Sequence, residues 1–294
     1  MKRLFSTYPA LLIAVYTIFW EVMEHLSATA GVSIYQVVWT RYAIHLAFLA
    51  VVFGPRYGLR LVRSSHLGRQ IIRSLFMLGM PLCFIWVLPR MSGQDMLAVF
   101  WTAPVLVIAI AIMTRGQSGG VLTFAAAAIG FVGIILICKP DTGVFHPAAL
   151  LALGMALCLA FYIVMSRTMR HEAELTKLVH TALWVFVPLT FVLPFFWQTP
   201  TLQGFVAMSV IGVMSCGMLY ALDLAVERVP PAFLAPVLYT QFAWDMVLRW
   251  SLHTATPDTR TIIGTLLVFV AAGSAILWSA RQVPLPQLSR SSPL

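Results

Sequence analysis

The sequence has little charge for its length. Only 10% of its 294 residues are Asp, Glu, Lys or Arg, whereas 60% are hydrophobic, against about 25% and 45 to 50% in an average soluble domain. So few charged side chains cannot cover the surface of a water-soluble protein of this size. With a mean hydropathy of +0.90, the composition excludes a disordered, fibrous or disulfide-stapled chain and predicts a membrane protein.

Cysteine and the common active-site motifs are also scarce. The four cysteines are far apart, form no CxxC pair and lie in or beside apolar runs, which is typical of small core residues. The sequence contains no Walker motif, no HExxH, no GxSxG and no acidic pair with the spacing of metal ligands. It therefore predicts no bound metal, no cofactor and no use of ATP.

Long apolar runs are what the sequence does contain. A membrane-spanning helix needs about 20 predominantly apolar residues, and the chain has ten such runs with short connections between them. The runs are too long for barrel strands and lack their alternation, so we expect an all-α membrane protein without an extramembrane domain. The predicted spans are 7–27, 33–53, 70–89, 94–114, 120–138, 146–166, 177–197, 203–223, 231–251 and 259–279.

The basic residues, 19 Lys and Arg against 10 Asp and Glu, fall mainly on one side of this arrangement. If the N-terminus is cytoplasmic, the outer side receives only Arg90, Lys139 and Arg260, with Arg249 at its border. The positive-inside rule requires such an asymmetry, so we predict a bacterial inner membrane protein with both termini cytoplasmic. The rule accounts for the basic segment 56–73, and no nucleic-acid partner is predicted. The inner basic residues are Lys2, Arg3, Arg56, Arg60, Arg63, Arg69, Arg73, Arg115, Arg167, Arg170, Lys177, Arg228, Arg281 and Arg290.

The N-terminus also has features of a signal peptide. Lys2 and Arg3 precede an apolar run, and Ala28-Thr29-Ala30 imitates a cleavage site. The run is longer than that of a typical signal peptide and carries two glutamates and a histidine near its end. We favour a retained first helix, because cleavage would also leave an odd number of spans.

Weak self-similarity links the two halves of the chain. Ala10-Leu11-Leu12 and Ala149-Leu150-Leu151 begin the first and sixth spans 139 residues apart, and Gly133 and Gly273 are 140 residues apart. Five spans are an odd number, so two such halves lie in the membrane with opposite orientations, which is a recurrent transporter design. We therefore expect ten helices as two inverted five-helix repeats. The predicted units are 1–140 and 146–281, followed by a cytoplasmic tail, 282–294.

A repeated tetrapeptide gives a different offset. Ala103-Pro104-Val105-Leu106 recurs as Ala235-Pro236-Val237-Leu238 after 132 residues, so it fits the repeat only with a small insertion. Pro104 and Pro236 are candidate hinges, because a proline within a helix frees a backbone carbonyl. Prolines are also common in membrane helices that have no hinge, and both interpretations stay open.

Three spans carry charged residues near one depth. A charge near the bilayer centre costs about 2.5 to 3.5 kcal/mol and usually faces a cavity or a partner. At 1.5 Å per residue, Glu21 and Asp245 lie about 9 Å, and Arg41 about 12 Å, below the outer ends of their spans. Three charged residues from three spans at a similar depth predict a substrate-binding or gating site, with Arg41 between two carboxylates. A purely structural ion pair is the alternative, and Asp245 can pair with Arg249 one turn away.

Titratable residues around this depth are candidates for proton coupling. They are Glu21, Glu24 and His45. His45 shares a helix face with Arg41 at a spacing of four residues, whereas Glu24 lies near the interface, where solvent can reach it. Intramembrane ionisable residues are functional candidates in general.

Four aromatic residues are placed deeper than the interfacial belt in which Trp and Tyr are usually found. Trp20, Trp101, Tyr239 and Trp244 lie beside the charges or in the proline-containing spans. They could line a pocket that stacks on a planar or cationic substrate. Packing between helices is the alternative.

Five segments of the sequence match a known family pattern in their order and spacing. They are Tyr35–Tyr42 with its Arg after an apolar stretch, Ala103–Leu106, Ile129–Pro140, Leu234–Gln241 and Pro257–Gly264. In this order the chain resembles, over essentially its whole length, the paired EamA domains of the drug/metabolite transporter superfamily. The resemblance implies alternating-access movement of small organic metabolites, commonly amino acids, nucleoside-like compounds or drugs.

The chain departs from that family at three places. The family often has a Gly-Glu pair after the fourth span and an acidic residue after the ninth. In this chain the corresponding segments are 113–116 and 251–254, and neither contains a glutamate. No role of those glutamates can therefore be carried over. Asp245 stands where the family leads us to expect an apolar residue.

These observations predict a secondary transporter for a small polar or amphipathic metabolite, driven by a proton gradient or by exchange. We expect a monomer or homodimer among membrane lipids, and no catalytic residues. The alternatives are a lipid-headgroup flippase and an intramembrane lipid-modifying enzyme. The second would need a nucleophile with a base, or a metal cluster, at the interface, and the sequence offers neither.

Overall fold

The computed structural model describes residues 11–20, 31–115, 120–251 and 257–282, together with residues 22, 23 and 26. All regular secondary structure in these ranges is helical, as the composition predicts. An apolar helix, Leu11–Trp20, comes first. The elements that follow are α2 (Ile34–Tyr57), η1 (Gly58–Leu61), α3 (Leu67–Val87), α4 (Gly93–Phe100), α5 (Ala103–Arg115), α6 (Gly120–Cys138), η2 (Thr142–Phe145), α7 (Ala149–Thr168), α8 (Glu174–Val192), η3 (Leu193–Phe195), α9 (Leu202–Arg228), α10 (Pro231–Leu238), α11 (Thr240–Ser251) and α12 (Thr259–Gln282).

Within the described ranges, eight helical segments are long and apolar enough to cross a membrane. Their outer faces carry large apolar side chains, such as Val51, Val121 and Leu150, which are 74%, 87% and 74% exposed. An apolar surface of this extent is unfavourable in water and suits the hydrocarbon of a bilayer. The chain is therefore a multi-pass membrane protein.

Two of the ten predicted spans are not among these eight segments. The first is represented by Leu11–Trp20, which is shorter, and Glu21, Glu24 and His25 lie outside the described residues. The predicted span 231–251 is divided at Tyr239 into α10 and α11. The span 94–114 is interrupted as well, between α4 and α5, although the two together are long enough to cross.

The two prolines of the repeated tetrapeptide lie on opposite sides of these interruptions. Pro104 is the second residue of α5 and follows its interruption, a position where the missing N–H of proline costs nothing. Pro236 lies inside α10, before the interruption at Tyr239, and removes a backbone hydrogen bond there. The tetrapeptide thus does not occupy equivalent places in the two interrupted spans.

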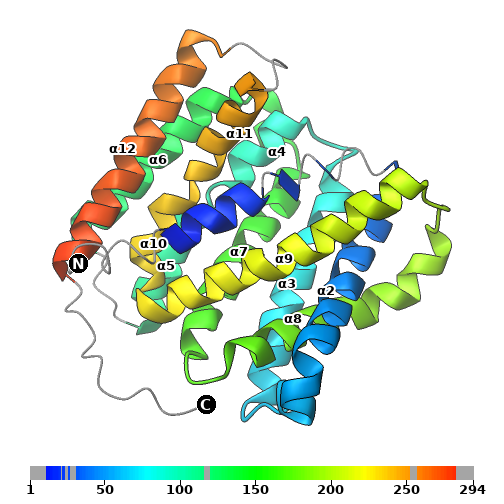
Figure 1. Ribbon diagram of the computed structural model, residues 1–294. Coiled ribbons are helices and arrows are strands. Elements are labelled where there is room, and N and C mark those ends of the chain that lie inside the picture. The colour runs from blue at the N-terminus through cyan, green and yellow to red at the C-terminus, as the bar shows by residue number, and fades with distance from the viewer. Residues whose placement is uncertain are drawn as a thin grey trace.

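The helices run between two ends of a bundle (Figure 1). One end, which we call the basic end, contains the connections 58–66, 169–173 and 229–230. Hydrogen bonds that involve side chains hold this end together: the Ser65 N–H donates to Glu172 at 2.9 Å, and Arg167, near the end of α7, donates at 2.8 Å to the carbonyl oxygen of Val226, near the end of α9. The opposite end contains the connections 31–33, 88–92, 139–148 and 196–201.

Helices α6 and α12 lie side by side along one flank of the bundle (Figure 1). Their backbones meet at Gly133 and Gly264, where a Cβ on either residue would lie 2.6 Å from the carbonyl oxygen of the other. Small residues permit such close approach in membrane helix pairs. At the opposite end, an ion pair of 2.8 Å between Lys139 and Asp258 joins the two helices again.

Candidate functional site

A cavity of about 650 Å³ lies among the helix Leu11–Trp20, α2, α3, α4, α7, α9 and α11. It reaches the opposite end of the bundle, because Ile34 at the start of α2 and Leu88 at the end of α3 are among its lining residues. Aromatic rings and methionines dominate the lining. They are Tyr16, Trp20, Tyr42, Phe84, Phe100, Trp101, Met23, Met77, Met80, Met96, Met155 and Met218.

Arg41 is the charged residue among the described residues of this lining. It stands on α2 about 10 Å along the helix from Ile34 at 1.5 Å per residue. Its Nε is buried and has no hydrogen-bond partner within the described part of the chain. Its guanidinium carbon lies 5.1 Å from the centre of the Tyr42 ring. A guanidinium with an unused donor beside an apolar cavity is suited to bind an acceptor group of a ligand.

Trp20 is surrounded by other rings on one side of the cavity. Its ring centre lies 5.7 Å from that of Tyr16, 6.2 Å from that of Phe100 and 6.5 Å from that of Trp101. Trp101 itself caps the C-terminal end of α4 at the interruption of that span. These separations are in the range in which aromatic pairs attract one another. The interruption between α4 and α5 thus lies at a cluster of rings that lines the same cavity as Arg41.

The sequence-predicted residues divide between the cavity and its surroundings. Arg41, Trp20 and Trp101 line the cavity, whereas Tyr239 and Trp244 are not among the lining residues. Tyr239 is completely buried, 6.2 Å from Trp101, and its ring occupies the space that a Cβ at Gly130 would need. Its role in the structure is therefore packing behind Trp101.

Predicted acidic residues cannot be placed in the same way. Glu21 and Glu24 lie outside the described residues, and so does the side chain of Asp245, although its backbone belongs to α11. Gln241 of the same helix does line the cavity and was not predicted. The sequence contains little indication of Gln241, because a single amide within an apolar span has no distinctive pattern.

His45 lies one helical turn from Arg41 toward the basic end. It is completely buried, and neither ring nitrogen has a hydrogen-bond partner among the described residues. Its ring lies 6.2 Å from that of Tyr42. It is not one of the residues that line the cavity, so a ligand there would not touch it.

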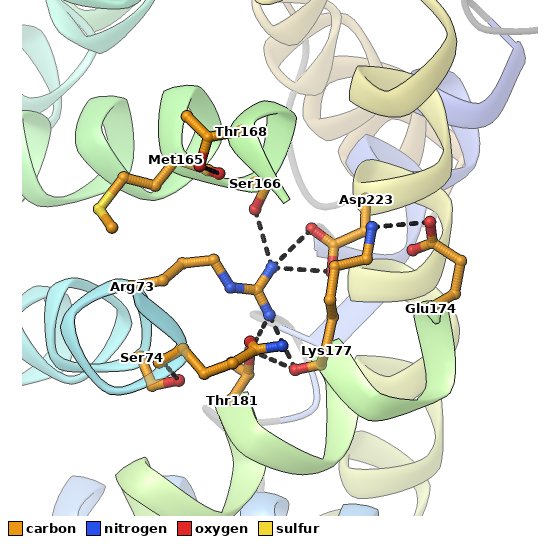
Figure 2. Close-up of polar contacts among 10 residues, drawn as sticks. Arg73, Ser74, Met165, Ser166, Thr168, Glu174, Lys177, Thr181 and Asp223 are labelled. Carbon is orange, nitrogen blue, oxygen red and sulfur yellow. Dashed lines mark hydrogen bonds and ion pairs between the residues drawn. The ribbon is translucent and has the colours of Figure 1, made fainter. Parts of the chain in front are cut away.

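A second polar cluster lies within the bundle near the basic end and was not predicted. Figure 2 shows the guanidinium of Arg73 between α7, α8 and α9. It donates to Asp223 at 3.1 Å, to the Ser166 hydroxyl at 2.9 Å and, at 2.7 Å each, to the Lys177 carbonyl oxygen and the Thr181 hydroxyl. Neither Arg73 nor Asp223 is exposed. We call these five residues the Arg73 cluster.

Arg73 and Lys177, which the sequence places among the basic residues of the cytoplasmic side, lie near the basic end but are buried within the bundle. Both side chains are 0% exposed. The helices extend further toward the basic end than predicted, because α3 begins at Leu67 and α9 continues to Arg228. Arg73 and Asp223, at the borders of the predicted spans 70–89 and 203–223, therefore lie more than one turn inside their helices. Lys177 meets Glu174 at 2.7 Å, one turn away at the start of α8. The sequence did contain one indication of this cluster: Asp223 is flanked by apolar residues on both sides.

Known proteins resemble the chain in sequence over most of its length, although no family model matches it. It is 22% identical over 271 residues to a riboflavin transporter of Vibrio cholerae, covering 89% of each chain. It is 20% identical over 262 residues to an S-adenosylmethionine uptake transporter of Rickettsia bellii, covering 86% of this chain and 90% of the relative. With its apolar helices, the chain is accordingly a membrane transport protein. Both relatives are named as transporters, not as enzymes.

A solved crystal structure has the same fold. It matches this chain with a TM-score of 0.81 at 17% sequence identity, over 93% of this chain and 98% of the other. At this identity the likeness concerns the fold alone.

Proposed function

We propose that the protein is a secondary transporter that moves a small organic metabolite across a bacterial inner membrane by alternating access. One observation carries the proposal: a cavity of about 650 Å³ reaches one end of the bundle, while the Arg73 cluster joins four helices near the other. A transporter at rest must be open to one side and closed to the other. The basic end is the cytoplasmic side in this proposal, by the positive-inside rule.

Two interrupted spans support an inverted repeat of ten helices. In one, α4 has 8 residues and α5 has 13; in the other, α10 has 8 and α11 has 12. The interruptions at Trp101 and Tyr239 are 138 residues apart, close to the offsets of 139 and 140 between the other repeated residues. Discontinuous helices in matching places are typical of transporters whose substrate site lies at the repeat interface.

The contacts between helices fit the same division into 1–140 and 146–281. In an inverted repeat α2 corresponds to α8, α3 to α9 and α6 to α12. The packing of α2 on α9 then has its counterpart in that of α8 on α3, and α6 packs on α12. Both halves thus contribute to one interface, on which one half can rock against the other.

Opening toward the basic end requires α3 to part from α8 and α9. Arg73 and its partners therefore form the inner closure in this proposal. Parting a buried ion pair leaves two uncompensated charges and is strongly unfavourable unless water reaches them. Substrate binding and entering water together would have to supply that free energy.

The roles of individual residues follow from their positions. Arg41, Trp20 and Trp101 bind the substrate, with Tyr239 and Trp244 supporting the ring cluster. Glu21, Glu24, Asp245 and His45 are the candidates for gating or proton coupling, and Pro104 and Pro236 are the candidate hinges.

Flux measurements in proteoliposomes test the proposed transport directly. The names of the relatives supply two probes, riboflavin and S-adenosylmethionine, which are offered as radiolabelled solutes with and without a pH gradient. We expect saturable accumulation of at least one solute of metabolite size, and its stimulation by a gradient if protons are coupled. Movement of fluorescent phospholipid without solute flux would replace the proposal with a lipid flippase.

A further inference from the structure

The cavity lining points to a particular chemistry of ligand. We propose that the site takes a planar heteroaromatic ring carrying an uncharged or anionic hydrogen-bond acceptor, with the ring beside Trp20 and the acceptor on Arg41. This inference rests on the proposed function, since it names the substrate class of the same cavity. It is carried by the rings, the methionines and the Nε of Arg41, which has no hydrogen-bond partner among the described residues.

The rings form one wall of the site. Trp20 lies beside Phe100 and Trp101, and Tyr16 meets its edge at an interplanar angle of 62°. Trp20 is only partly buried, whereas Trp101 is 1% exposed. Trp20 is therefore the ring with free surface, and a flat ligand gains by stacking on it.

Methionines make up much of the remaining wall. Met77 and Met80 on α3, Met96 on α4, Met155 on α7 and Met218 on α9 line the cavity. Methionine is flexible and polarizable, and its sulfur makes favourable contacts with aromatic rings. Such a wall adapts to the outline of a ring system without selecting one hydrogen-bonding pattern.

Arg41 sets the polarity of the ligand. Its Nε has no hydrogen-bond partner among the described residues, and the described residues of the lining include no other charged side chain. An acceptor on the ligand would satisfy this buried donor, and a bond to a charged group is worth about 1.5 to 3 kcal/mol. A cationic ligand would leave the donor unsatisfied and add like-charge repulsion.

The size of the cavity allows a ring system with a side chain. Ligand pockets typically have volumes of about 300 to 1,000 Å³, and this cavity has about 650 Å³. The amide of Gln241 is a further polar lining group, so it can orient a second polar atom of the ligand.

Binding to the purified full-length protein in detergent tests the inference with three probes. Riboflavin is planar and uncharged and carries ring carbonyl acceptors, proflavine is a planar cation, and ribitol is the polar chain without a ring. We expect saturable binding of riboflavin, binding of proflavine at least tenfold weaker, and none of ribitol. Equal or tighter binding of proflavine would overturn the assignment of Arg41.

Variants assign the two halves of the site. Arg41→Gln should weaken riboflavin binding by about tenfold or more, whereas Arg90→Gln, the same change near the opposite end, should leave it unaltered. Trp20→Leu should weaken binding by about two- to tenfold, with the exposed Trp86→Leu as its control. Unchanged binding in Arg41→Gln and Trp20→Leu would place the ligand elsewhere.

Flux separates the failure of this inference from the failure of transport. If proteoliposomes accumulate a solute that riboflavin does not compete with, transport stands and the ligand class is wrong. If riboflavin binds with the expected dependence on Arg41 but no solute moves, the ligand class stands and the proposed transport is wrong.

Discussion

Arg73 on α3 and Asp223 on α9 form an ion pair of 3.1 Å in which neither side chain is exposed. The two residues are 150 positions apart in the chain, and they belong to different proposed halves of the molecule. The guanidinium also lies 4.9 Å from the centre of the Tyr162 ring on α7. A buried polar contact thus connects the halves at the end of the bundle away from the cavity opening.

Breaking this pair should destabilise the protein strongly. Asp223→Asn leaves Arg73 buried without its counter-charge, and removal of one partner of a buried pair costs about 3 to 5 kcal/mol. Thermal unfolding in detergent should show a large decrease in the midpoint. The double variant Arg73→Met with Asp223→Leu should be more stable than Asp223→Asn, because neither charge of this pair stays buried. If the double variant is the less stable of the two, the pair contributes more than the burial of its charges costs.

Access to the basic end should depend on the same pair. Ser166→Cys places a thiol within the Arg73 cluster, where a water-soluble maleimide reacts slowly while the cluster is closed. We expect faster labelling in proteoliposomes when transported substrate is present, and in the Asp223→Asn background without it. Equal labelling rates in every condition would show that this end does not open at the cluster.

The contact of α6 with α12 should not tolerate a side chain at its closest point. A Cβ at Gly133 would lie 2.6 Å from the carbonyl oxygen of Gly264, whereas a Cβ at Gly273 would have nothing within 4 Å. Gly133→Ala should cost about 1 to 3 kcal/mol because backbone must move. Gly273→Ala should be neutral or stabilise by up to about 1 kcal/mol through helix propensity. Unfolding midpoints of the two variants compare them directly, and equal midpoints would contradict the close packing.

The sequence predicted the helical membrane fold well because long apolar runs are a property of the chain itself. It predicted a larger group because charge and aromatic rings at one depth of several spans are rare, and three of its members, Arg41, Trp20 and Trp101, line the cavity. Tyr239 and Trp244 do not line it, and Glu21 and the side chain of Asp245 lie outside the described residues. The Arg73 cluster was not predicted, because Arg73 follows Arg69 near a predicted helix end, where basic residues are normally exposed to water. Arg73 is buried because its partners lie on three other helices. These partners are far from Arg73 in the sequence, so the sequence alone does not indicate that they meet.

The interruptions of two spans were also beyond the sequence pattern. An unbroken apolar stretch predicts a helix but does not say whether its backbone bonds continue through the middle. Trp101 lies at the end of α4, and its ring packs on those of Trp20 and Phe242, at 6.5 and 5.3 Å. That packing is a tertiary effect. The prolines were visible, but they do not mark the interruptions in one way: a proline disturbs the turn before it, which fits Pro104 after the end of α4 but not Pro236, which precedes Tyr239.

The ion pair at the ends of α6 and α12 should make a pH-dependent contribution to stability. Lys139 and the hydroxyl of Thr261 hold the pKa of Asp258 well below its ordinary value of 3.8. A carboxyl group whose pKa is lower in the folded state stabilises that state above its ordinary pKa, and the contribution is lost as the pH falls. Lys139→Gln should raise the pKa of Asp258 and slightly lower the unfolding midpoint at pH 7. The difference from the parent protein should shrink below about pH 4, where the unfolded carboxyl takes up its proton. A difference that persists unchanged to pH 2 would mean that the change acts through the left-handed backbone of Lys139, with φ of 50°, and not through charge.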